Sequence, residues 1–147
     1  MPYTSISRPL LIAAAALLAL TGLIHAIEAP GYFDAQTYVG VLFVLNVIGA
    51  AVGVVGLRRG APRWAWLLGV AVAGGAFVGF ILARTTGLPS FKESEWEPLG
   101  IASLVIEASF CLIALVGAVY FAIGRPDRGV ARHVHDTLEP TGAERAG

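Results

Sequence analysis

The chain has 147 residues, of which 56% are hydrophobic and only 14% are charged. Soluble domains carry about 25% charged residues, so this composition excludes an ordinary soluble domain and indicates a membrane protein. Ten basic residues balance ten acidic ones, which argues against nucleic acid as a partner because nucleic-acid-binding domains are usually strongly basic. The single cysteine, Cys111, excludes a disulfide or a cysteine-based zinc site within one chain.

Four apolar runs follow one another, and each is long enough to cross about 30 Å of hydrocarbon as a helix. They cover residues 9–27, 38–57, 64–83 and 99–123. Backbone groups in lipid must be hydrogen-bonded within their own segment, which favours helices. The sequence therefore predicts an all-α fold, a polytopic membrane four-helix bundle over residues 1–124. A mobile cytoplasmic tail is expected over residues 125–147, which are polar and contain proline and glycine.

The first run, residues 9–27, has a second interpretation. Arg8 precedes it and small residues follow it, as in a secretory signal peptide. Against this, His25 and Glu28 crowd the position where a signal peptidase would cut, and three more spans follow.

Basic residues predict the orientation of the bundle. They gather before the first span, between the second and third spans, and after the fourth span: Arg8; Arg58, Arg59 and Arg63; Arg125, Arg128 and Arg132. The other two connections are mainly acidic. Because basic loops stay on the cytoplasmic side, both termini and the middle connection are expected in the cytoplasm.

The two halves of the chain share a weak pattern that is compatible with duplication. His25 stands five residues before Pro30, as Arg84 stands five before Pro89. Two hairpins repeated in parallel would bring the polar residues of both halves together at the outer end of the bundle. Small-residue pairs, Gly49 with Gly53 and Gly75 with Gly79, predict close helix packing of the GxxxG type.

Glu107 and Arg84 are the main candidates for a functional pair. Glu107 lies inside the fourth apolar run and Arg84 at the end of the third. Ionisable groups at membrane depth are costly and usually face a partner or the bundle interior. Two interpretations stay open: a salt bridge that joins the two halves, or a pair that lines a pocket for a polar group, an ion or a proton.

Other polar residues are candidates for the same outward-facing cluster. His25 and Glu28 lie three residues apart and share a helix face, which suits an acid–base pair or two metal ligands, although zinc sites usually use three or four ligands. Asn46 is expected to hydrogen-bond between helices and to reach the cluster. Trp96 suits an interfacial anchor or a lid over the cluster. No sequence motif identifies a cofactor.

Across most of its length the chain resembles small four-span membrane proteins of high-GC bacteria. The resemblance rests on the His25–Pro30 end of the first span and on the segment RTTGLPSFKESEWEPLG, residues 84–100. It implies the four-span layout and the bacterial cytoplasmic membrane as location, and it implies no activity. The chain lacks the cysteine pair of quinone-reducing four-helix oxidoreductases.

Three functional hypotheses follow. The first is an integral membrane binding or accessory protein whose ligand site comprises His25, Glu28, Asn46, Arg84, Trp96 and Glu107. Its ligand would be a small molecule, a metal ion held by His25 and Glu28, or a partner protein. The second is an intramembrane enzyme of the cyclase or isomerase type that acts on a lipid or isoprenoid, with Glu107 or Glu28 as acid and His25 as base.

The third hypothesis is an ion or proton transporter, which needs a homo-oligomer because four helices leave little room for a pathway. The state of the polar cluster distinguishes the hypotheses. A sealed cluster favours a structural role, a cavity open to the lipid favours binding or catalysis on a lipid, and a path to the cytoplasm favours transport.

Overall fold

The computed structural model describes residues 8–60 and 62–123, so the predicted tail lies outside the described residues. The described part folds into four helices: α1 (Arg8–Ala35), α2 (Thr37–Arg58), α3 (Arg63–Arg84) and α4 (Pro98–Ile123). All four are long and apolar enough to cross a membrane. The predicted all-α bundle of four membrane-spanning helices is confirmed.

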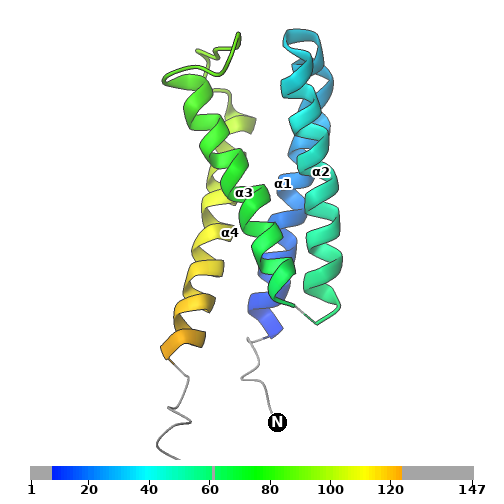
Figure 1. The fold of residues 1–147 in the computed structure, drawn as a ribbon, viewed down its shortest axis with the longest axis vertical. Helices are drawn as coiled ribbons and strands as arrows, with labels where there is room; N and C mark the ends of the chain where they lie inside the picture. Colours follow the sequence, from blue (N-terminus) through cyan, green and yellow to red (C-terminus); the bar gives the residue numbers. More distant parts are fainter. Residues whose placement is uncertain (1–7, 61, 124–147) are drawn as a thin grey trace, which may run out of the picture.

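The helices form two hairpins, α1–α2 and α3–α4, that stand side by side (Figure 1). We call the end of the bundle that carries the connection between Arg58 and Arg63 the basic end, and the end that carries residues 85–97 the loop end. α1 begins and α4 ends at the basic end (Figure 1). Both hairpins therefore run in the same sense, as the predicted repeat requires, while the duplication itself and the side facing the cytoplasm stay predictions.

The first helix is longer than its apolar run. α1 continues through Pro30 to Ala35, so Glu28 and Asp34 are helical and do not lie in a connection. A proline inside a helix removes one backbone hydrogen bond, and packing of α1 along α2 compensates for that loss. Only Gln36 separates the two helices. This extension places Glu28 and Tyr32 on the same continuous helix as His25.

The packed core lies in the half of the bundle nearer the basic end. Its buried residues come from all four helices: Ala14, Leu18, Ala50, Leu57, Ala65, Ala73 and Phe110. Most of them are small, so the helix backbones approach closely there. Toward the loop end the upper parts of α2 and α3 diverge (Figure 1).

The two glycine pairs have different surroundings, so the packing prediction is correct for one pair only. A Cβ at Gly49 would come within 2.6 Å of Val72 Cγ2, and one at Gly53 within 2.7 Å of Leu18 Cδ2. α2 therefore packs closely against α3 and α1 at these positions. A Cβ at Gly75 or Gly79 would meet nothing within 4 Å. These two glycines leave space beside α3 where a contact between helices was expected.

This difference makes a prediction about stability. Gly49→Leu is expected to destabilise the protein by about 1–3 kcal/mol, because overpacking forces neighbours to shift and the β-branched Val72 is stiff at χ1. Gly75→Leu is the matched control and is expected to keep or slightly raise the melting temperature, because leucine favours a helix over glycine. Thermal unfolding in detergent measures both. Equal melting temperatures for the two variants would contradict the packing described here.

Candidate functional site

A cavity of about 390 Å³ lies between the two hairpins toward the loop end. All four helices and the 85–97 loop contribute to its lining. The wall from α3 includes several small residues, among them Ala71, Gly75, Ala76 and Gly79, beside Val72, Phe80 and Arg84. This volume falls in the range of small-molecule sites, about 300–1,000 Å³. The open space beside Gly75 and Gly79 is therefore part of a cavity large enough for a ligand.

The cavity opens sideways between α2 and α3. Its lining residues on these two helices include exposed ones, such as Leu42 and Leu45, which are 52% and 57% exposed. The lining residues on α4 are buried, with Ser103 4% and Glu107 1% exposed. Since α2 and α3 are membrane-spanning helices, the opening lies on a face that lipid would cover.

The α3–α4 loop covers the cavity at the loop end. Leu88 and Phe91 line the cavity and exchange two backbone hydrogen bonds, of 2.7 and 3.0 Å, around a tight turn. Ser90 in this turn has a φ of 55°, a backbone conformation that is uncommon outside glycine. The hydroxyl of Tyr38 donates a 2.9 Å hydrogen bond to the carbonyl of Pro89 and ties the turn to α2. The loop thus connects the two hairpins across the top of the cavity.

Glu107 and His25 meet at the deep end of the cavity. The hydroxyl of Ser103 donates a 2.7 Å hydrogen bond to Glu107 Oε1. His25 Nδ1 lies 2.9 Å from the carbonyl oxygen of Thr21. A carbonyl oxygen only accepts, so Nδ1 carries the proton, and in the neutral ring Nε2 has a free lone pair. Nε2 lies 3.9 Å from Glu107 Oε1, too far for a direct hydrogen bond.

Asn46 adds another polar group near this end. Its amide nitrogen donates a 3.1 Å hydrogen bond to the carbonyl of Val72, as the predicted interhelical role requires. Its Oδ1 is buried and has no hydrogen-bond partner. Turning the amide over would set two acceptor oxygens against each other, so the carbonyl of Val72 fixes the orientation. An unpaired buried acceptor of this kind is costly and points to a missing donor.

Arg84 lies at the loop end of the cavity and does not pair with Glu107. Its Cζ sits 3.6 Å above the centroid of the Phe80 ring and 5.9 Å from that of Trp96. Its Nε donates a 2.8 Å hydrogen bond to the carbonyl of Glu95. The Arg84–Glu107 salt bridge that the sequence left open is absent from the described residues. Arg84 instead anchors the loop through cation–π contacts and a backbone hydrogen bond.

Aromatic rings form the wall between the deep and outer ends of the cavity. The ring of Phe43 lies 4.6 Å from that of His25 and 4.2 Å from that of Tyr32. Tyr32 in turn contacts Phe91 of the loop, with the ring centroids 5.9 Å apart. Glu28 and Tyr32 are both within electrostatic range of Arg84. The cavity therefore has polar groups at both ends and an apolar middle.

The structure brings together most of the residues that the sequence singled out. His25, Glu28, Asn46, Arg84 and Glu107 all line the cavity. Trp96 does not line it: the indole stacks edge-on against Phe80, with centroids 5.7 Å apart, and is 54% exposed. Trp96 thus contacts Arg84 from outside the cavity, and its role as an interfacial anchor stays a prediction.

The structure adds no third ligand to the metal site proposed for His25 and Glu28 among the described residues. Within residues 8–60 and 62–123, no group of three or more His, Cys, Asp or Glu side chains is placed to hold a metal ion. His25 faces Glu107 across the bundle, while Glu28 lies one turn further along α1 toward Arg84.

Five residues have a role at the site that was not anticipated from the sequence. Thr21 and Ser103 each stand four residues before the group that they support, His25 and Glu107. For Ser103 and Glu107 the spacing places both side chains on one helix face, so it was a usable signal, whereas Thr21 supports His25 through its backbone carbonyl, which any residue supplies. Phe43 and the open glycine pair carried no such signal, because apolar and small residues occur all along these helices.

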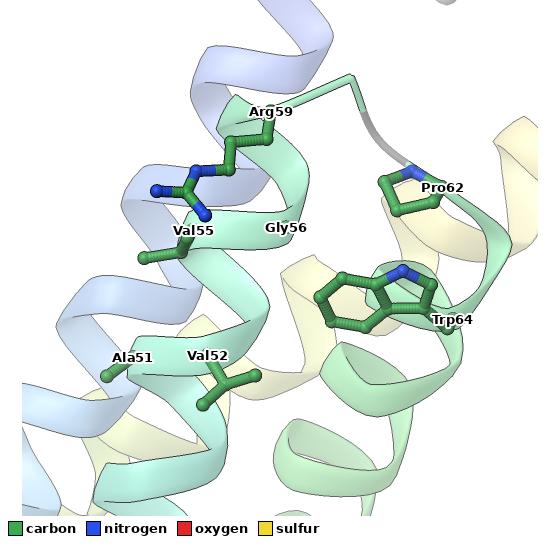
Figure 2. Close-up of a pocket in the computed structure, with 7 residues that line it drawn as sticks. All are labelled: Ala51, Val52, Val55, Gly56, Arg59, Pro62 and Trp64. Atoms are coloured by element: carbon green, nitrogen blue, oxygen red, sulfur yellow. The ribbon is translucent and has the colours of Figure 1, made fainter.

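A second hollow of about 410 Å³ lies between α2 and α3 at the basic end. Figure 2 shows its lining residues, with the Trp64 ring below the connection and Arg59 at the rim: Ala51, Val52, Val55, Gly56, Arg59, Pro62 and Trp64. Arg59 supplies its one charged group. Ligand sites need several convergent polar groups to orient a ligand, which this hollow lacks, so the cavity at the loop end is the candidate site.

No protein-family model, curated protein or solved structure matches this chain. The case for a function therefore rests on the geometry of the site.

Proposed function

We propose that the protein is an integral membrane binding protein that takes up one small amphipathic molecule from the bilayer. The observation that carries this proposal is the cavity at the loop end, which opens between the membrane-spanning helices α2 and α3 and ends at buried polar groups. A ligand that arrives through lipid must be largely apolar, and the polar floor would orient it. We place the protein in the bacterial cytoplasmic membrane.

The lining supports uptake from lipid in preference to transport. On the side of the basic end, the lining stops at Asn46, Ala71 and Glu107. Beyond it the fully buried side chains of Leu18 and Phe110 pack between the helices. Among the residues that the structure describes, the lining therefore leads to the membrane face and stops short of the basic end.

A second function is favoured by one observation. His25 Nε2 and Glu107 Oε1 lie 3.9 Å apart in the cavity, so a bound molecule could contact a proton donor and a proton acceptor at once. Such a pair suits acid–base isomerisation of an isoprenoid. Time-dependent conversion of a bound isoprenoid, abolished by His25→Phe, is the result expected for an enzyme. Unchanged recovery of the isoprenoid supports the binding function alone.

Blocking the cavity tests the proposed function. Gly75→Leu fills space where a Cβ meets no atom within 4 Å, so the variant is expected to fold and to exclude the ligand. Gly117→Leu on α4 is the matched control, because Gly117 is equally open and does not line the cavity. Native mass spectrometry of protein purified with host lipids is expected to show one lipid-sized adduct on the wild type and on Gly117→Leu.

The adduct is expected to fall at least tenfold in Gly75→Leu. Equal adduct in all three proteins, or none on the wild type, would contradict a lipid-binding cavity. Metal analysis of the same samples tests the metal hypothesis for His25 and Glu28 independently.

A further inference from the structure

The deep end of the cavity presents hydrogen-bond acceptors that have no donor. Asn46 Oδ1 is buried without a partner. His25 Nε2 has a free lone pair, because Nδ1–H is committed to the carbonyl of Thr21. Glu107 receives one hydrogen bond, from Ser103, and a carboxyl group has further lone pairs in either protonation state. Buried acceptors are rarely left unpaired, so this end lacks a donor that a ligand would bring.

The spacing of the acceptors suits a single small donor group. His25 Nε2 and Glu107 Oε1 are 3.9 Å apart. By distance alone, one oxygen can lie about 2.8 Å from both of them, the usual O–H···O distance. The gap is thus too wide for a direct hydrogen bond, and a hydroxyl placed there would donate its one hydrogen to one of the two atoms.

The depth of these groups limits what the rest of the ligand can be. His25 stands ten residues before the end of α1 at Ala35, which is about 15 Å at 1.5 Å per residue. Glu107 stands nine residues after Pro98, about 14 Å along α4. Both therefore lie about 14–15 Å from the loop-end termini of their helices, inside the part of the bundle that spans the membrane. A charged headgroup is costly at that depth, whereas a neutral hydroxyl is not.

We infer that the cavity selects a long-chain alcohol, whose hydroxyl donates its one hydrogen to one of the acceptors that Asn46, His25 and Glu107 present at the deep end. The apolar chain lies against the small residues of α3 and leaves between α2 and α3. This inference rests on the proposed function, because it names the ligand class of the same cavity. It also assigns Asn46 a role in ligand selection beyond its hydrogen bond to Val72.

A pair of matched probes tests the inference. Farnesol and farnesyl methyl ether have nearly the same shape, and only the alcohol donates a hydrogen bond. The wild type in detergent is expected to bind farnesol at least tenfold more tightly than the ether, measured by native mass spectrometry titration. This comparison uses the unmodified protein, so it does not depend on the folding of any variant.

The variant Asn46→Leu removes the unpaired acceptor and keeps a similar shape. Its affinity for farnesol is expected to fall to that for the ether, while its affinity for the ether stays within about twofold of the wild type. Retained ether binding shows that the cavity is intact, which separates loss of selection from loss of fold.

Three outcomes would overturn the inference. Equal binding of farnesol and the ether, both lost in Gly75→Leu, would leave the proposed function standing and remove the selection of a hydroxyl. Tenfold tighter binding of farnesyl phosphate than of farnesol would place the polar group of the ligand at Arg84 instead. Failure of all three probes to bind would contradict the alcohol class, and the host-lipid experiment would then decide on the proposed function separately.

Discussion

Replacing Glu107 with leucine is expected to lower the affinity for farnesol at least tenfold, to that for the ether, while leaving the melting temperature within about 4 °C of the wild type, the shift that about 1 kcal/mol produces in a domain of this size. Glu107 is 1% exposed, accepts a hydrogen bond from Ser103 and lies 3.9 Å from His25 Nε2. Removing one partner of a buried hydrogen bond costs about 1–3 kcal/mol when the other partner is left unsatisfied, and little when that partner finds another acceptor.

In Glu107→Leu, Ser103 loses the acceptor of its hydrogen bond but has another acceptor within reach. Ser103 can turn its hydroxyl toward the carbonyl four residues earlier in α4, as Ser109 does toward Val105 at 2.7 Å. The acceptor for the ligand, by contrast, is lost without replacement. Glu107→Leu is therefore expected to weaken ligand binding without a large change in stability.

Thermal unfolding in detergent and farnesol titration on the same samples measure the two effects. Glu107→Gln is the conservative control, since its amide oxygen still accepts from Ser103, and it is expected to bind farnesol with an affinity between those of the wild type and Glu107→Leu. A large drop in melting temperature with binding retained would make Glu107 a structural residue and would remove it from the site.

The helices could be predicted from the sequence because their signal is local. The second run, 38–57, and the third, 64–83, match α2 and α3 to within one residue at each end. The end of α1 was missed because Pro30 and the polar residues around it are typical of a connection. In the structure α1 continues to Ala35, since the adjacent α2 packs along it, and packing between helices leaves no local signal in the sequence.

The members of the site could be predicted better than their pairing. Charged and polar residues inside apolar runs marked His25, Asn46 and Glu107 correctly as groups that face the bundle interior. The proposed salt bridge between Arg84 and Glu107 did not take into account how far apart the two residues lie along the bundle axis. Arg84 ends α3 at the loop end, while Glu107 lies about 14 Å further down α4. The rise per residue alone therefore argued against a direct salt bridge.

The cavity itself could not be predicted, because it depends on where two hairpins separate. Gly75 and Gly79 have the same spacing as Gly49 and Gly53, yet one pair lines open space and the other packs closely. Large residues elsewhere contribute to the difference, above all Phe110, which is fully buried in the core below the cavity and packs against Gly69 of α3. Replacing Phe110 is therefore the substitution with the largest expected effect on the stability of the fold.

Phe110→Ala is expected to destabilise the protein by about 2–4 kcal/mol. Phe110 is fully buried, and a Cβ on Gly69 would collide with its ring. The ring also stacks near Trp66, with centroids 6.2 Å apart. Large-to-small core changes cost about 3–5 kcal/mol for phenylalanine in water-soluble proteins. Part of that cost is transfer from water, which a membrane-spanning helix does not gain, so the loss of packing is the main remaining term.

Leu112→Ala is the matched control, since Leu112 lies on the same helix and is 61% exposed toward lipid. It is expected to change the melting temperature by less than about 4 °C, which corresponds to about 1 kcal/mol. Chemical or thermal unfolding in detergent measures both variants. If Phe110→Ala were as stable as Leu112→Ala, the hairpins would be held together by other contacts. The floor of the cavity would then not depend on Phe110, and the variant should bind farnesol like the wild type. If Phe110 does support that floor, farnesol binding falls together with stability, in contrast to Glu107→Leu, which weakens binding alone.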